Sequence, residues 1–324
     1  MTQQTVIRAN GLAKTFTGRR GTVEAVRGVD LSVAAGEIVG FLGPNGAGKT
    51  TTLRMLTTLL QPTAGRASIA GHDLRTDPNG VRRSIGYVAQ GGGAGSDARV
   101  LDELVYQAQF YGINRTDAQN RADALLTQLD LTGLGGRDVK TLSGGQRRRL
   151  DIALGLVHTP SVVFLDEPTT GLDPQSRSNM WDHIERLRGR TGCTVFLTTH
   201  YLEEADFLCD RILVIDDGRI VAEGTPEELK CAVSGDLVRL SVNGDEAAAG
   251  NAITLARRFA DVTSPRIDGT EVSFRLPQAE RHAVRLLHDL DAAGIVLEGI
   301  AIERPTLDDV FLTLTGRTLR DEAA

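Results

Sequence analysis

The stretch EIVGFLGPNGAGKTT, Glu37–Thr51, joins an apolar segment to a glycine-rich loop and then to a helical pattern. The loop matches G-x-x-x-x-G-K-[ST], in which backbone N–H groups at a helix N-terminus surround phosphate groups. Its glycines let the backbone approach closely, Lys49 supplies a positive charge, and Thr50 supplies a hydroxyl for Mg²⁺. The predicted nucleotide-binding loop comprises Gly43, Pro44, Asn45, Gly46, Ala47, Gly48, Lys49, Thr50 and Thr51.

The sequence around this loop has the alternation of an α/β protein. From residue 5 to about 230, short apolar segments alternate with helical patterns. We expect a helix over Lys49–Leu60, because Gln61-Pro62 would end it. Asp217-Gly218 lies between two apolar segments and predicts a β-hairpin. From about 95 to 160 helical patterns replace the strands, which indicates an inserted helical subdomain.

Composition narrows the class of protein. The chain has 324 residues, of which 41% are hydrophobic and 24% charged, as in ordinary globular proteins. Its net charge of −6 gives no basic surplus, so we expect no nucleic-acid partner. Cys193, Cys209 and Cys231 lack metal-ligand spacing and are expected to be reduced. Without a signal peptide or an apolar run of about 20 residues, a role in a membrane process would require a partner and the cytoplasmic side.

After about residue 235 the pattern changes. Strands and helices follow the order βαββαβ, which is typical of a small α+β, ferredoxin-like module. An amphipathic segment, Thr306–Leu314, comes last. The elements predicted for this module are Leu237–Val242, Ala247–Phe259, Val262–Ile267, Glu271–Leu276, Gln278–Ala293 and Ile295–Ile302. We therefore expect one domain over residues 1–230, with its helical subdomain at about 95–160, and an accessory domain over 231–324.

Two adjacent carboxylates, Asp166 and Glu167, follow the apolar strand Ser161–Leu165. At the end of a strand beside a phosphate loop, one carboxylate is suited to hold Mg²⁺ through water. The other is suited to polarise an attacking water, which is the work of a general base. A solvated acidic turn is the alternative when the pair is considered alone.

The run Leu142-Ser143-Gly144-Gly145-Gln146 precedes a second helical pattern. Ser143 is a good N-cap, and the glycines expose N–H groups at a helix start that favours anions. Because the phosphate loop already has its own helix start, this one is suited to a second nucleotide. Considered alone, it is an ordinary capped helix. The basic run that follows, Arg147–Arg149, is expected to form a solvated face.

Three isolated side chains complete the candidate site. Gln90 opens the loop QGGGAGSD, where its carbonyl is suited to ligate Mg²⁺, orient water or sense a γ-phosphate. His200 follows the apolar strand Thr194–Thr198 and is suited to contact the γ-phosphate. Phe16 is suited to stack on adenine, with a plain core or surface aromatic as the alternative.

Taken in order, these motifs resemble the ATP-binding subunit of an ABC transporter over residues 5 to about 230. The resemblance implies a P-loop ATPase cassette with a RecA-like core, an antiparallel β subdomain and a helical subdomain. It implies ATP and Mg²⁺ as cofactors and a head-to-tail homodimer that shares each ATP. The residue roles that it implies are adenine stacking by Phe16, the Q-loop at Gln90, the signature at Ser143, Gly144, Gly145 and Gln146, the metal carboxylate at Asp166, the catalytic base at Glu167, the D-loop carboxylate at Asp173 and the switch histidine at His200.

The C-terminal motifs are similar to those of the daunorubicin-resistance type of ABC ATPase, notably TLDDVFLTLTG at Thr306–Gly316. This resemblance implies a peripheral subunit on the cytoplasmic side of the cell membrane. ATP hydrolysis would power efflux of a hydrophobic drug or antibiotic, which a separate integral-membrane permease binds. Two alternatives stay open: the ATPase of a lipid or glycolipid exporter, and a non-transport ABC ATPase.

Overall fold

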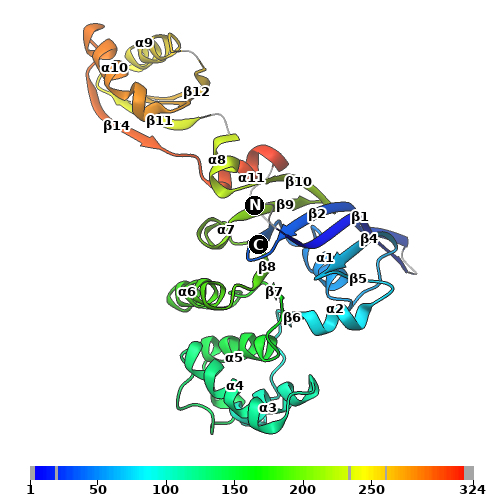
Figure 1. Cartoon of the computed structure of the whole chain (residues 1–324). Helices are drawn as coiled ribbons and strands as arrows, with labels where there is room; N and C mark the ends of the chain where they lie inside the picture. The colour runs from blue at the N-terminus through cyan, green and yellow to red at the C-terminus, as the bar shows by residue number, and fades with distance from the viewer. Residues whose placement is uncertain (1–3, 19–20, 233–234, 260, 317–324) are drawn as a thin grey trace. The chain divides into compact units, whose positions relative to one another are not determined.

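The computed structural model describes residues 4–18, 21–232, 235–259 and 261–316, which fall into two compact units (Figure 1). One unit runs to Pro226 and the other begins at Glu227. Each has its own buried apolar cluster. The predicted domains include residues 1–3 and 317–324, which lie outside the described residues. None of the described helices has the length and apolar character needed to cross a bilayer.

The first unit begins with an antiparallel sheet. Strand β1 pairs with both β2 and β4, and register shifts along β1 mark irregularities in the pairing. Ile7, Ala9 and Leu12 of β1 are buried against the core. Helix α2 (Pro78–Ser84) follows this sheet. The strands, in the spatial order β2-β1-β4-β5, are β1 (Thr5–Gly18), β2 (Gly21–Ala34), β4 (Ala64–Ile69) and β5 (His72–Asp73).

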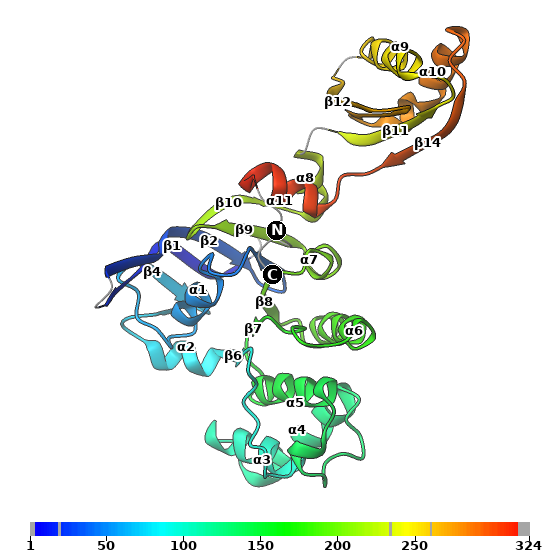
Figure 2. The ribbon, with the colours of Figure 1, turned by 180° about the vertical axis from the view of Figure 1, so that it is seen from behind.

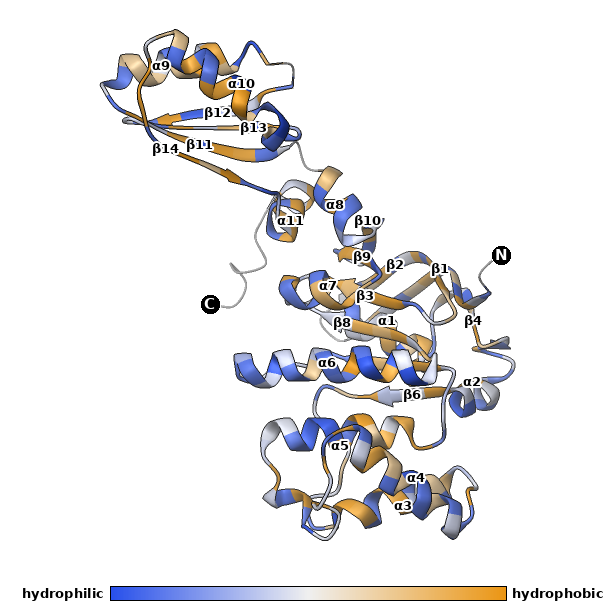
Figure 3. Ribbon diagram, turned by 60° about the vertical axis from the view of Figure 1, so that its left-hand side comes forward, coloured by the Kyte–Doolittle hydropathy of each residue, from blue (hydrophilic) through white to orange (hydrophobic). Residues whose placement is uncertain are grey.

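A second sheet carries the motifs that follow apolar strands. Its central strands β3, β7 and β8 are buried along their whole length, and β3 and β8 are mainly apolar in Figure 3. They run parallel, so their carboxyl ends meet at one edge. In the order β10-β9-β3-β8-β7-β6, the strands are β3 (Ile38–Leu42), β6 (Ile85–Val88), β7 (Val162–Asp166), β8 (Thr194–Thr199), β9 (Arg211–Asp216) and β10 (Arg219–Gly224).

The predicted hairpin at Asp217-Gly218 is confirmed. Strands β9 and β10 pair antiparallel across these two residues. Asp217 and Gly218 both have positive φ, 44° and 74°. This conformation gives a tight two-residue turn whose twist matches that of the flanking strands.

The helix that follows the phosphate loop is shorter than predicted. Helix α1 (Lys49–Leu56) ends before Leu60, because Thr57 is its C-cap and Thr58 turns to a left-handed φ of 63°, which cannot continue the helix. Beyond strand β6, helices α3, α4 and α5 gather into a group of their own (Figures 1 and 2). The remaining helices of this unit are α3 (Val100–Phe110), α4 (Arg115–Gln128), the short 3₁₀ helix η1 (Val139–Thr141), α5 (Gly144–Leu156), α6 (Pro174–Thr191) and α7 (Leu202–Leu208).

The second unit has the predicted βαββαβ order. Its antiparallel sheet has the order β12-β13-β11-β14, which is the ferredoxin-like arrangement. Helices α9 and α10 lie on one face of this sheet (Figure 3), and their apolar side chains share its core. Its elements are α8 (Pro226–Ala232), β11 (Asp236–Val242), α9 (Glu246–Ala256), β12 (Thr263–Asp268), β13 (Glu271–Leu276), α10 (Ala279–Ala292), β14 (Leu297–Glu303) and α11 (Leu307–Thr315).

Candidate active site

The phosphate loop connects β3 to the N-terminus of α1. Gly48 is the N-cap of α1 at a φ of 105°, and a Cβ there would lie 2.5 Å from the Ala25 carbonyl oxygen. Only glycine therefore fits without a shift of the backbone. The buried Nζ of Lys49 donates to the carbonyls of Gly43 and Pro44, at 2.7 and 3.0 Å. Lys49 thus closes the loop on itself at the N-terminus of α1, where backbone N–H groups favour phosphate.

Asp166 is the last residue of β7 and is buried beside the loop. Its Oδ1 accepts from Thr50 Oγ1 at 3.1 Å and from Thr198 Oγ1 at 2.7 Å. The Asp166 carboxylate at the end of β7 and the Thr50 hydroxyl in α1 therefore lie side by side. Both are oxygen ligands of the kind that Mg²⁺ prefers.

Glu167 has an unusual backbone conformation. It has a φ of 46°, a left-handed value that is uncommon outside glycine. Its N–H donates to the carbonyl and hydroxyl oxygens of Thr198. Strain of this kind persists only where the surroundings determine the conformation. Here it turns the Glu167 side chain away from the strand direction and toward the phosphate loop.

Four side chains surround the Glu167 carboxylate. Gln90 Nε2 donates to Oε2 at 2.8 Å, and Thr170 Oγ1 donates to Oε2 at 3.1 Å. His200 Nδ1 and Lys49 Nζ lie 3.3 and 3.7 Å from Oε1, at ion-pair distances. Burial acts to raise the pKa of Glu167, but contact with His200, Lys49 and Thr170 outweighs it and brings the pKa below its usual value. The carboxylate is therefore ionised at neutral pH, as a general base must be.

Lys49, Gln90 and Glu167 line a small cavity of about 210 Å³ at the carboxyl ends of the strands, whereas His200 and Asp166 are not among its lining residues. This position, outside the ends of parallel strands, is where ligands bind in α/β sheets. The cavity brings together residues far apart in the sequence that were all predicted for one site. Its lining consists of Asn45, Gly46, Gly48, Lys49, Thr50, Thr51, Gln90 and Glu167.

The predicted signature residues lie at the start of α5. The expectation that Ser143 caps this helix is confirmed: its hydroxyl accepts from the Gln146 N–H, and Gln146 Oε1 accepts from the Ser143 N–H. Gly144 and Gly145 form the first turn. A Cβ on Gly145 would lie 3.5 Å from Ser176 Oγ. The signature therefore lies beside the start of α6.

Asp173 is the N-cap of that neighbouring helix. Its carboxylate accepts from the Ser176 N–H at 2.9 Å and from the Ser176 hydroxyl at 2.6 Å. These hydrogen bonds hold the pKa of Asp173 below its usual value. Asp173 and the signature thus share Ser176 as a neighbour. Among the described residues, neither contributes to the lining of the cavity at Lys49 and Glu167.

Phe16 lies on β1, apart from the phosphate-loop cavity. Its side chain is 42% exposed, and Lys14 Nζ lies 5.2 Å from the ring centre. The ring is therefore accessible on the antiparallel sheet, opposite Val23 of β2. An exposed aromatic face is compatible with stacking on a planar base.

The expectation for the basic run is wrong at Arg148. This residue is buried, and its guanidinium donates to the carbonyls of Ala89, Asp166, Glu167 and Pro168. Burial lowers the pKa of Arg148, although Asp151 and Asp166 oppose that effect. A run of three arginines resembles a solvated face, because nothing local distinguishes the one that packs inward. The helical repeat offered the only signal, since adjacent side chains point about 100° apart.

Glu204 was also missed. It lies on α7 and is fully buried. Thr169 Oγ1 and Trp181 Nε1 donate to its Oε1, at 2.8 and 3.2 Å. Desolvation raises the pKa of Glu204, although hydrogen bonds from Thr199 and Thr169 act against it. The carboxyl group connects the segment after Glu167 to the helix after His200.

Sequence models of two families match the chain. That of the ABC transporter family matches residues 26–170. That of the ATP-binding protein DrrA1-3-like C-terminal domain matches residues 224–315. The two matches fall on the two compact units.

The chain is similar over almost its whole length to named relatives. It is 42% identical to the daunorubicin/doxorubicin resistance ATP-binding protein DrrA of Streptomyces peucetius, over 98% of this chain and 94% of that protein. It is 44% identical to the daunorubicin resistance ATP-binding protein DrrA3 of Streptomyces coeruleorubidus, over 99% of each. Among solved structures, a dimeric ATP-binding cassette in a post-hydrolysis state, bound to ADP and Pi, matches with a TM-score of 0.62 and 26% identity. That match covers 68% of this chain and 98% of the cassette.

Proposed function

This chain belongs to the ABC transporter ATP-binding proteins of the daunorubicin-resistance type, and we propose that it powers efflux of a hydrophobic drug or antibiotic through a separate permease. It is an ATPase whose hydrolysis is coupled to transport. The observation that carries the proposal is the Glu167 carboxylate, ionised and held between Lys49 and Gln90 at the edge of the phosphate loop.

The residues of the site divide the work of hydrolysis. The N–H groups of the phosphate loop and Lys49 bind the β- and γ-phosphates and stabilise the negative charge that spreads over them. Glu167 accepts a proton from the attacking water, since its carboxylate is ionised and fixed. Gln90 and His200 contact that carboxylate from two sides and orient it. Phe16 offers its exposed face to adenine.

The oxygens near Asp166 fit a magnesium ion. Thr50 Oγ1 and Asp166 Oδ1 lie 3.1 Å apart, and the amide of Gln90 lines the same cavity as Thr50. Magnesium uses one or two protein carboxylates together with substrate phosphates. We assign Thr50, Asp166 and Gln90 to this ion. When bound, Mg²⁺ would neutralise charge on the phosphate oxygens.

A second copy of the chain completes the site. The N–H groups of Gly144 and Gly145, at a helix start capped by Ser143, suit a γ-phosphate but lie outside the lining around Lys49. The proposal therefore places each ATP between the phosphate loop of one chain and Ser143–Gln146 of the other, with Asp173 at the same interface. The dimeric state of the matching cassette supports this arrangement.

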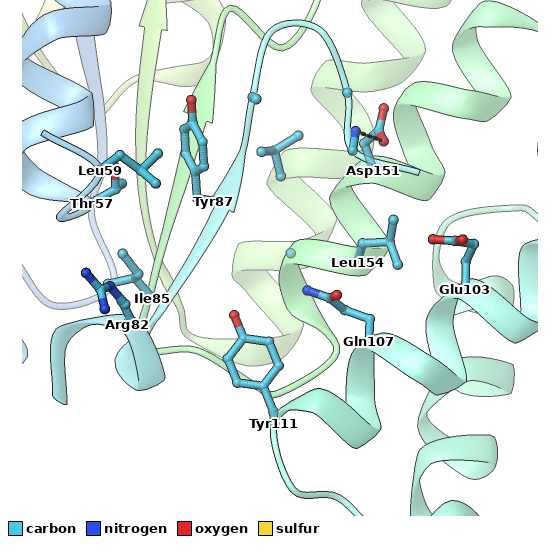
Figure 4. A pocket seen from close by; sticks show the side chains of 15 residues that line it. Thr57, Leu59, Arg82, Ile85, Tyr87, Glu103, Gln107, Tyr111, Asp151 and Leu154 are labelled. Atoms are coloured by element: carbon cyan, nitrogen blue, oxygen red, sulfur yellow. Dashed lines mark hydrogen bonds between the residues drawn. The ribbon is translucent and has the colours of Figure 1, made fainter. Parts of the chain in front are cut away.

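An open cavity of about 390 Å³ is the place where we expect the permease to dock. Tyr87 of β6, Tyr111 after α3 and Asp151 of α5 face it (Figure 4). Leu59 lines the cavity and is exposed, and Phe110, which precedes the lining residue Tyr111 in the sequence, is 86% exposed. Apolar surface of this kind marks protein interfaces. A permease bound here would place the chain on the cytoplasmic side of the membrane.

The hydrolysis is tested with Glu167→Gln, which keeps the shape of the side chain and removes the base. We expect Pi release to fall by about 10²- to 10⁴-fold, while binding of a fluorescent ATP analogue is retained and a stable dimer forms with ATP. Glu203→Gln, at an exposed glutamate of α7, is the matched control and should hydrolyse ATP normally. Near-normal hydrolysis by Glu167→Gln would contradict the assignment of the base.

The transport partner is tested in proteoliposomes that contain the full chain with its copurified permease. We expect ATP-dependent movement of daunorubicin, and its loss with Glu167→Gln. Phe110→Asp should weaken permease binding, whereas Val284→Asp, an exposed apolar position on α10, should not. Transport of a lipid but of no drug would replace the proposed substrate class.

A further inference from the structure

Arg148, on the helix that begins with the signature, lies buried beside the candidate active site. Arg148 of α5 is 8% exposed, and each of its three guanidinium nitrogens donates to a backbone carbonyl. Nε donates to Pro168 O at 2.8 Å, Nη1 to Ala89 O at 2.6 Å and Nη2 to Asp166 O at 3.0 Å. Nη2 also reaches Glu167 O at 3.3 Å. This rigid fork therefore joins two separate backbone segments.

Those segments carry the two partners of one hydrogen bond. Ala89 immediately precedes Gln90, and the other accepting carbonyls belong to Glu167 and the residues on each side of it. Gln90 Nε2 donates to Glu167 Oε2 at 2.8 Å. Arg148 thus fixes the backbone on both sides of the Gln90–Glu167 contact, and its described hydrogen bonds all go to carbonyls rather than to either side chain.

Its neighbours in the sequence make different contacts. Arg149 donates to the carbonyls of Leu129 and Asp130, which follow α4. Arg147 reaches Ala94 O at 3.3 Å, farther along the glycine-rich loop. The three arginines therefore bind different parts of the backbone. Among their described contacts, only those of Arg148 reach the end of β7 and Glu167.

Asp151, one turn farther along α5, secures the rest of the loop. Its Oδ1 accepts from the N–H groups of Gly93 and Ala94, at 2.9 and 3.2 Å. Gly92 has a φ of 76°, and a Cβ there would lie 2.7 Å from Asp151 Oδ2. The glycine-rich segment after Gln90 is thus fitted closely to α5.

We propose that Arg148 is a positioning residue for hydrolysis, which sets Gln90 and Glu167 in register from the helix that begins with the signature. The inference rests on the proposed function, since it assigns Glu167 as the base. Movement of α5 would shift Ala89 and the Asp166–Pro168 backbone together. A shift of the signature helix would in this way change the position of Glu167 in the same chain.

The test compares Arg148→Gln and Arg148→Lys with Arg149→Ala, whose arginine also donates to backbone carbonyls but lies away from the base. For the Arg148 variants we expect kcat to fall at least about tenfold, while the Kd for a fluorescent ATP analogue changes less than about threefold. Arg148→Lys should also lose activity, because an ammonium is a point charge that cannot reproduce the fork. Arg149→Ala should keep its kcat even where thermal unfolding shows lost stability.

A double-mutant cycle gives a readout that a purely structural role would not move. If Arg148 acts through the Gln90–Glu167 contact, Arg148→Lys should lower kcat much less in the Gln90→Ala background than in the natural chain. Independent effects on kcat, or equal losses in Arg148→Lys and Arg149→Ala, would overturn the inference. If Arg148→Gln fails to fold, Arg148→Lys and the cycle decide. Failure of the natural chain to hydrolyse ATP would instead overturn the proposed function.

Discussion

Gln90 and Glu167 are 77 positions apart in the sequence, yet Nε2 of the amide donates to Oε2 of the carboxylate at 2.8 Å. They follow β6 and β7, which are adjacent parallel strands. The two strands deliver both side chains to the same edge of the sheet. A displacement of the loop after Gln90 therefore reaches the candidate base directly.

Lys49→Ala should weaken nucleotide binding. The ammonium group is buried within the loop, and loss of a charge-assisted hydrogen bond to phosphate should raise Kd by about 10- to 100-fold. Titration with a fluorescent ATP analogue measures this change. Lys230→Ala, on α8 of the other unit, is the control and should leave Kd unchanged. An unchanged Kd for Lys49→Ala would remove its phosphate-binding role.

Substitutions at Ser143 separate its capping role from its proposed contact with a second nucleotide. Ser143→Ala loses the cap, which should cost about 1 kcal/mol of unfolding free energy. Ser143→Asp keeps an N-cap acceptor, so its Tm should stay near that of the natural chain.

The Asp variant should nevertheless lose hydrolysis, because its carboxylate would repel the phosphates of ATP bound by the partner chain. Nucleotide binding by the isolated chain should be retained. Thermal unfolding and Pi release distinguish the two effects. Normal turnover by Ser143→Asp would argue against a signature that acts on the nucleotide of the other chain.

The pH dependence of Glu167 follows from its lowered pKa. A folded pKa below the ordinary 4.5 means that the ionised form stabilises the fold above pH 4.5, and that this contribution is lost as the pH falls through the folded pKa. The advantage in Tm of the natural chain over Glu167→Gln should therefore decline only on the acid side of 4.5. With His200 replaced by Gln, so that no imidazole titrates 3.3 Å from the carboxylate, a decline between pH 6 and 8 would contradict the lowered pKa of Glu167.

The contribution of Glu204 to stability changes with pH in the opposite direction. Its folded pKa is raised above 4.5, so its contribution to stability is full below pH 4.5 and is lost as the pH rises toward the folded pKa. Glu204→Gln mimics the protonated form and keeps an oxygen for Thr169 and Trp181. We expect the Tm of Glu204→Gln, relative to the natural chain, to increase as the pH rises from 4.5 to 8. Glu203→Gln should show no such trend, and a flat difference for Glu204→Gln would refute the raised pKa.

Local patterns predicted much of this molecule. The phosphate loop, the acidic pair after an apolar strand and the Ser143 cap all depend on neighbours a few residues away. The ferredoxin-like order of the second unit also followed from the alternation of its strands and helices. Helix α1 ends before the predicted Leu60, because the left-handed backbone at Thr58 stops it well before Pro62. The domain limits and the roles of the site residues stay predictions.

The sequence by itself determined which side chains have the chemistry for a nucleotide, because loops, caps and strand ends are encoded over short spans. Only the tertiary structure decided which of Arg147, Arg148 and Arg149 packs against the backbone beside Gln90 and Glu167. Successive helix residues point about 100° apart, so three adjacent arginines point in three different directions. The run alone does not show which of them faces the core. The packing of α5 beside β6 and the end of β7 turned Arg148 inward, where the carbonyls beside Gln90 and Glu167 accept its hydrogen bonds.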